Sequence, residues 1–264
     1  REIEIPAAWK GKRIFLYFER THWLSSVYVG KEEVSKIDYI SIPHNHELTQ
    51  WLHPGKKELI TFCIDNRYQY DTHKWDHAHS EFTQINWNGV LGEIKLVAVD
   101  PVYVDAMQVY PDIKNKSIKV KMTVRNCTEH TASGKISFHV TGKDYRLQKE
   151  VPVTVTDSIT YIEEEMFLSK DIHLWNEFHP NLYTLDCKLT SSVEGQSYAH
   201  EKSTTFGMRE VEAGEDHIIL NGEPIHLRGT VENAVFPKTG YAPVDDASWE
   251  RVLRILKEYG MNHI

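Results

Sequence analysis

The chain has few cysteines, no long apolar run and no excess of positive charge, and each absence excludes a class of protein. Only three of its 264 residues are cysteine, and they lie far apart, which argues against a disulfide framework or a zinc site. No run of about eighteen apolar residues exists, so we expect no transmembrane helix and no membrane partner. The formal net charge is -8, so we expect no nucleic-acid partner.

The three cysteines, Cys63, Cys127 and Cys187, each lie in or beside an apolar strand pattern. We therefore expect them to be buried free thiols.

The N-terminal residues, Arg1 to Pro6, contain no methionine, no basic region and no apolar core of the kind that begins an exported protein. They are typical of the middle of a strand, so we expect a longer protein whose export signal, if it has one, would lie upstream. The sequence leaves the compartment open, periplasmic and secreted locations included.

Residues 1–100 are predicted to form a β-sandwich, because short apolar strands follow one another without a helical period. The predicted strands include residues 13–19, 27–31, 59–64 and 94–99. A polar loop from Arg67 to Asn88 interrupts this block. Loops of this length are uncommon in compact domains and are often functional.

Residues 101–206 are predicted to form a second sandwich, of the immunoglobulin-like kind. Apolar and polar residues alternate over residues 118–124, 136–140 and 183–189, as in antiparallel sheets with one wet face. The acidic run Glu163–Glu165 is expected on a solvated strand edge, where charge prevents pairing with another chain.

Residues 207–264 are predicted to form a short β-hairpin followed by an α-helix, in contrast to the all-strand pattern before them. Asn221-Gly222 lies between two short apolar runs and predicts a two-residue hairpin turn. Asp245 is a good helix N-cap, apolar residues recur at helical spacing as far as Tyr259, and Gly260 is a natural residue to follow the helix. A new extended segment then begins, so this region is expected to be one βα unit of a larger barrel or sheet.

Taken together, these motifs resemble glycoside hydrolase family 2, the β-galactosidase and β-glucuronidase family. The motifs that carry the resemblance are Val27–Val29 with Lys31, His46–Thr49, Pro54–Gly55, Asn88–Val90 with Ile94, Leu174–Trp175, Pro180, Leu182–Tyr183, Phe206–Glu210 and Leu220–Gly229. The resemblance implies a mainly β chain with three parts. These are an N-terminally incomplete jelly-roll "sugar-binding" domain (1–100), an immunoglobulin-like β-sandwich (101–206) and the truncated start of a TIM (β/α)8 barrel (207–264).

The resemblance also implies an activity for the parent protein, which would hydrolyse a β-linked glycoside with retention. That chemistry uses two carboxyl groups roughly 5 Å apart, one as nucleophile and one as acid and base. In the family both are glutamates on later barrel strands, so no catalytic residue is assigned here and the chain alone is expected to be inactive. The family implies a β-linked glycan as partner, a parent that is a homo-oligomer and no cofactor.

The end of the first barrel strand is the part of the active site that this sequence is expected to contain. Side chains at the C-terminal ends of barrel strands face the substrate, so Arg228, Glu232 and Asn233 are candidate sugar-binding residues. The alternative for Arg228 is a structural salt bridge of the barrel. Many family members carry an Asn-Arg-His-Glu type of sequence where this chain has Thr230–Asn233, which leaves the galactose or glucuronate preference open.

The long loop of the first block supplies two further candidates, Asn86 and Trp87, on the expectation that it reaches the substrate site. The alternative is a surface loop whose tryptophans pack on the sandwich. The histidines and aspartates from Asp71 to His79 are residue types that can bind a metal. They show no fixed ligand spacing, so no metal site is expected.

Two other classes of protein compete with the enzyme interpretation. A stand-alone carbohydrate-binding module would fit the jelly-roll pattern. A structural tandem of adhesion sandwiches would fit the strand pattern, but the helix predicted from Asp245 to Tyr259 argues against it.

Overall fold

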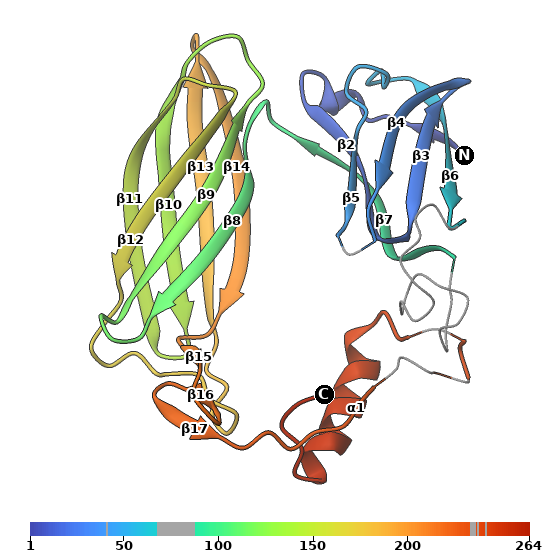
Figure 1. Ribbon diagram of the computed structural model, residues 1–264. Coiled ribbons are helices and arrows are strands. Elements are labelled where there is room, and N and C mark those ends of the chain that lie inside the picture. The colour runs from blue at the N-terminus through green and yellow to red at the C-terminus, as the bar shows by residue number, and fades with distance from the viewer. Residues whose placement is uncertain (41, 68–87, 233–235, 237, 241) are drawn as a thin grey trace. The chain divides into compact units, whose positions relative to one another are not determined.

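The computed structural model describes residues 1–40, 42–67, 88–232, 236, 238–240 and 242–264 (Figure 1). It is mainly β, as expected. Its contacts divide the chain into two compact units, Arg1–Ala98 with Leu227–Ile264, and Val99–His226. Within the described part of the chain, no helix combines the length and apolar character needed to cross a membrane.

The first unit contains two sheets, with strand orders β1-β6-β3-β4 and β5-β2-β7. Its described strands are β1 (Glu2–Glu4), β2 (Arg13–His22), β3 (Leu24–Val29), β4 (Glu32–Asp38), β5 (His44–Glu47), β6 (Lys57–Asp65) and β7 (Gly89–Val99), with a short 3-10 helix η1 (Ala7–Trp9). Alternation along β2 buries Ile14, Leu16 and Phe18. These side chains pack with Val27 and Ile60 from the other sheet, so the core lies between the two sheets.

The second unit contains a four-stranded sheet of order β11-β10-β13-β14 and a three-stranded sheet of order β12-β9-β8. Its strands are β8 (Val102–Asp112), β9 (Ser117–Asn126), β10 (Ala132–Gly142), β11 (Tyr145–Val155), β12 (Ile159–Phe167), β13 (Tyr183–Val193) and β14 (Gln196–Phe206). The predicted alternation is confirmed on β9, β10 and β13. Residues such as Val120, Ile136 and Leu185 are wholly buried in a core shared by both sheets.

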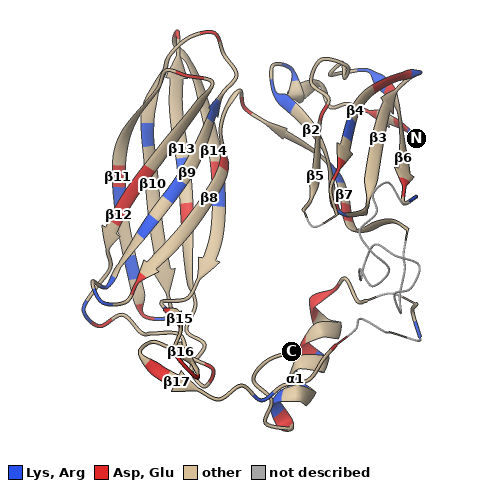
Figure 2. Cartoon of the chain, viewed as in Figure 1, with Lys and Arg blue, Asp and Glu red and all other residues tan. Residues whose placement is uncertain are grey.

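Residues of both charge signs are interspersed along the strands of the second unit (Figure 2). Ion pairs join neighbouring strands, as between Lys188 and Glu201 at 2.7 Å. The acidic run lies on β12, an edge strand, as the sequence predicts. Glu163 pairs with Lys121 of the adjacent strand, whereas Glu164 pairs with Lys149 of β11, the edge strand of the other sheet.

A small antiparallel sheet, β15-β16-β17, follows β14 in the second unit. It comprises β15 (Val211–Ala213), β16 (Ile218–Leu220) and β17 (Glu223–Ile225). Asn221 and Gly222 connect the last two strands with φ angles of 55° and 87°. Positive φ at both central residues defines a type I′ turn, which confirms the predicted hairpin.

The helix α1 (Asp246–Glu258) begins and ends where the sequence predicts. The Asp245 side chain caps it by accepting a hydrogen bond from the Ser248 amide at 2.8 Å. This hydrogen bond lowers the pKa of the Asp245 carboxyl below its usual value. Gly260, at φ 76°, ends the helix in the left-handed conformation.

The cysteine prediction is confirmed in one respect and wrong in another. All three thiols are free, but only Cys187 is buried, whereas Cys63 and Cys127 are exposed. The apolar pattern around Cys63 misled the prediction, because much of the outward face of β6 is exposed. Cys127 lies just beyond the end of β9, where the alternation no longer applies.

Candidate functional site

The C-terminal segment folds into the beginning of a parallel β-α-β arrangement. Gly229 forms a parallel bridge with His263, and α1 lies between them in sequence. A Cβ added to Gly229 would lie 2.3 Å from the His263 ring, so only glycine permits this approach. The segment after β17 is thereby placed beside the extended segment that follows the helix.

Arg228 is held by both its backbone and its side chain. Its amide donates to Asn262 Oδ1 and its carbonyl oxygen accepts from the Asn262 amide, each over 2.8 Å. Its Nε donates to the carbonyl oxygen of Gly260 over 2.9 Å. The guanidinium therefore lies at the C-terminal end of α1, where the helix dipole favours a cation.

The other sequence candidates are placed only in part. Glu232 is exposed, four residues beyond Arg228. Asn86, Trp87 and Asn233 lie outside the described residues, as do the histidines and aspartates weighed as metal ligands between positions 71 and 79. Of the five candidate sugar-binding residues, the structure therefore describes only Arg228 and Glu232.

A second set of contacts anchors the segment that leads toward Arg228, and it is centred on Trp175. The Trp175 amide donates to the Met208 carbonyl over 2.9 Å, and the Arg209 guanidinium lies 4.5 Å from the Trp175 ring centroid. Gly207 packs so closely that a Cβ there would lie 2.9 Å from Trp175 Cβ. Asn221 Nδ2 donates to the Trp175 carbonyl over 2.9 Å. The Phe206–Glu210 motif is thus a packing junction of the second unit.

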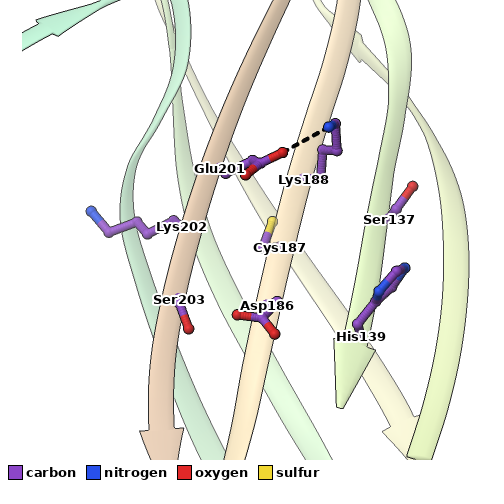
Figure 3. A pocket seen from close by; sticks show the side chains of 8 residues that line it. All are labelled: Ser137, His139, Asp186, Cys187, Lys188, Glu201, Lys202 and Ser203. Carbon is purple, nitrogen blue, oxygen red and sulfur yellow. Dashed lines mark hydrogen bonds and ion pairs between the residues drawn. The ribbon is translucent and has the colours of Figure 1, made fainter. Parts of the chain in front are cut away.

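The open face of the four-stranded sheet in the second unit is hollowed, with a volume of about 630 Å³ (Figure 3). Its lining is polar and includes His139, Asp186 and Ser203, which are direct cross-strand neighbours in one row. Asp186 lies between the other two, so His139 is not the partner that a serine nucleophile needs. The lining residues include no aromatic ring on which a sugar could stack. This hollow is a solvent-exposed face of the sheet, and its lining residues do not form a catalytic serine–histidine pair.

Within the part of the chain that the structure describes, no group of three or more histidine, cysteine, aspartate or glutamate side chains could hold a metal ion.

Sequence reasoning missed one group of residues with unusual chemistry, a buried pair of histidines on β5. His44 and His46 are both wholly buried and share hydrogen bonds with Ser25. The signal that could have found them is their spacing, because residues i and i+2 of a strand lie on the same face.

Comparison with known proteins relates the chain to one family. Residues 102–209 match the family model described as glycosyl hydrolases family 2. A β-galactosidase from Thermoanaerobacter pseudethanolicus is 23% identical over 267 residues, which cover 100% of this chain and 35% of that protein. A β-galactosidase from Actinobacillus pleuropneumoniae is 25% identical, over 97% of this chain and 23% of that protein.

Solved structures show the same fold. Bacteroides uniformis β-glucuronidase 2, covalently bound to cyclophellitol-6-carboxylate aziridine, superposes with a TM-score of 0.81 at 19% identity. The alignment covers 99% of this chain and 32% of the glucuronidase. The chain thus spans about a third of the length of these two relatives, the first galactosidase and this glucuronidase. The family model of glycosyl hydrolases family 2 thus matches residues 102–209, and the chain as a whole is similar to about a third of a solved family 2 member from Bacteroides cellulosilyticus, with a TM-score of 0.77 at 19% identity.

Proposed function

We propose that this chain is the N-terminal part of a retaining family 2 β-glycosidase, an exo-acting enzyme that removes a terminal β-linked sugar. The observation that carries the proposal is the end-to-end alignment with a β-galactosidase of which the chain covers 35%. The parent would therefore hold a further, larger region, to which we assign the chemistry.

We further propose three domains, with boundaries at 1–100, 101–206 and 207–264. The two packed sheets around each core support a jelly-roll sandwich in the first and an immunoglobulin-like sandwich in the second. The parallel bridge between Gly229 and His263, with α1 between them, supports the start of a (β/α)8 barrel in the third. The amphipathic α1 has no buried residue in this chain, as expected of a barrel helix whose neighbours are missing.

The proposed reaction uses two glutamates of the parent, and both belong to the part outside this sequence. One attacks the anomeric carbon as the other protonates the leaving oxygen, and water then releases the covalent glycosyl-enzyme. The B. uniformis relative was captured in covalent form with an aziridine, which is consistent with such a nucleophile in the family.

For this chain we propose that a few of its residues contribute to the substrate site of the parent enzyme. Arg228, Glu232 and Asn233 would lie near the barrel mouth, and Asn86 and Trp87 would reach it from the first domain. For Arg228 the contacts with Gly260 and Asn262 favour a positioning role over direct sugar contact.

The proposal is tested with the full-length protein encoded by the gene and with residues 1–264 alone, assayed on nitrophenyl β-galactosides and β-glucuronides. We expect hydrolysis by the full-length protein and none by the isolated chain. Incubation of the full-length protein with a 2-fluoro glycoside should add one sugar mass to a glutamate-containing peptide beyond Ile264. Turnover by residues 1–264, or sugar binding by a gene product that ends at Ile264, would favour a different activity or a stand-alone carbohydrate-binding module.

A further inference from the structure

Two histidines of the first unit cross the space between its two sheets. His44 and His46 belong to β5, at the edge of the β5-β2-β7 sheet, and both are wholly buried. Their hydrogen-bonding partners, Ser25 of β3 and Ser35 of β4, belong to the other sheet. At this edge a polar chain therefore joins the sheets, beside the apolar core that joins them elsewhere.

The distances define a continuous chain of four hydrogen bonds. His44 Nε2 lies 2.9 Å from the carbonyl oxygen of Tyr39, and His44 Nδ1 lies 2.6 Å from Ser25 Oγ. Ser25 Oγ lies 2.8 Å from His46 Nε2, and His46 Nδ1 lies 2.8 Å from Ser35 Oγ.

Only one arrangement of protons satisfies all four hydrogen bonds when both rings are neutral. The Tyr39 carbonyl can only accept, so His44 carries its proton on Nε2 and its Nδ1 accepts from the Ser25 hydroxyl. Ser25 Oγ then accepts from His46 Nε2–H, and His46 Nδ1 accepts from the Ser35 hydroxyl. Both histidines are therefore Nε2–H tautomers.

Protonation of His46 and protonation of His44 disturb this hydrogen-bond chain to different degrees. A proton on His46 Nδ1 leaves the chain connected, because the Ser35 hydroxyl can turn and accept. A proton on His44 Nδ1 directs two N–H donors at Ser25 Oγ, and the Ser25 hydroxyl loses its acceptor. Each cation would also be buried away from water, which disfavours the charged form.

Among the residues that the structure describes, the groups that face the two rings offer little compensation for a positive charge. β2 presents the Phe18 ring, 5.4 Å from that of His46, and β3 and β4 present the serine hydroxyls. Asp38 of β4 attracts a proton to His44, but burial outweighs it and lowers the pKa of His44. Burial, with the neighbouring His44, lowers the pKa of His46 to about 4.

We propose that the Ser35–His46–Ser25–His44 chain of hydrogen bonds is an acid-sensitive lock between the two sheets of the first unit. A proton on His44 breaks the chain, and a buried charge on either imidazole weakens it. Acidification would release β5 from β3 and β4. The proposal is independent of the glycosidase assignment, since it concerns the first sandwich alone.

The sign of the pH effect follows from the depressed pKa values. A histidine in the unfolded chain takes up its proton near pH 6.5, whereas His46 in the folded chain does so near pH 4. The contribution to stability is therefore fully present above about pH 6.5 and is lost as the pH falls toward 4. His46 alone would raise the unfolding constant of this unit roughly 20- to 90-fold between pH 7.5 and 4.5.

The test combines imidazole 15N NMR at pH 7.5 with pulse-labelled hydrogen exchange of residues 1–264 after incubation in urea at several pH values. We expect two slowly exchanging Nε2–H imidazole signals. We also expect the urea midpoint of peptides from β3 and β5 to fall with acidification more than that of peptides from β9. The triple variant Ser25→Ala/His44→Leu/His46→Leu should lose this excess, and His53→Gln, at an exposed histidine of the same unit, should keep it.

An Nδ1–H tautomer on either ring would overturn the proposal, as would a β5 midpoint that follows the same pH course in the wild type and the triple variant. If the triple variant does not fold, the tautomers measured in the wild type still decide.

Discussion

The side-chain amide of Asn221 donates to the backbone carbonyl oxygen of Trp175, 46 residues earlier in the chain, over 2.9 Å. The other atom of the same amide, Oδ1, accepts from the Glu210 amide over 3.0 Å. The turn residue thus connects three segments of the second unit, the β16–β17 hairpin, the Phe206–Glu210 motif and the loop before β13.

Replacing Asn221 with glycine should destabilise the second unit by about 1–2 kcal/mol, because two side-chain hydrogen bonds are lost and the positive φ is kept. Urea denaturation followed by tryptophan fluorescence gives the change. Asn221→Ala is the matched comparison. It loses the same hydrogen bonds and adds backbone strain, so it should be less stable than the glycine variant. Equal stability of all three proteins would show that the side chain contributes nothing.

Replacing Gly207 with alanine should destabilise the same unit by about 1–3 kcal/mol, because the new methyl would lie 2.9 Å from Trp175 Cβ. Differential scanning calorimetry should show a lower transition temperature for the second unit. Ser203→Ala, on the exposed face of β14, is the control and should leave that temperature nearly unchanged. A Gly207→Ala protein as stable as the control would mean that Trp175 moves aside at no cost.

Glu194 is the non-glycine residue of a second tight turn, between β13 and β14, and has a φ of 47°. Asparagine tolerates this conformation better, so Glu194→Asn should stabilise the unit by about 0.5–1 kcal/mol. The exposed pair between Glu194 and His130, 3.5 Å apart, is lost in the variant but contributes little. The denaturation midpoint in urea measures the gain, and a lower midpoint would show that the ion pair outweighs the strain.

The three thiols should separate into two classes. Burial raises the pKa of the Cys187 thiol to about 12, so it is neither ionised nor accessible near pH 8. Cys63 and Cys127 are exposed. Ellman's reagent at pH 8 should therefore modify two thiols quickly in the native protein and the third only after denaturation.

Single variants identify which thiols react. Cys63→Ser and Cys127→Ser should each remove one fast equivalent. Rapid reaction of a third equivalent in the native protein would contradict the burial of Cys187.

The regular elements were predictable because their signals are local. Alternation along β9, β10 and β13, the Asn221-Gly222 turn and the Asp245 cap each depend on residues a few positions apart. The exposure of Cys63 was not predictable, because an apolar neighbourhood in sequence does not reveal how the faces of a strand are covered.

In the candidate site too, local sequence signals were informative and contacts between distant segments were not predictable. Its position at the end of a predicted strand made Arg228 a candidate, but its contacts with Gly260 and Asn262 depend on the helix returning beside it. The hydrogen-bond chain through His44 and His46 could not be predicted from the sequence for a related reason. Both histidines share a face by spacing, yet their serine partners come from strands of another sheet.

The ion pair between Glu164 and Lys149 has a consequence for the protein in concentrated solution. It joins β12 to β11, the edge strands of the two sheets, and Lys149 also donates to the Glu165 carbonyl oxygen over 2.9 Å. A second molecule that approached this edge would meet an occupied carbonyl and a row of carboxylates. At high protein concentration the edge strand β12 should therefore not pair with a second copy of the molecule. Neutralising the carboxylates should make such edge-to-edge association possible.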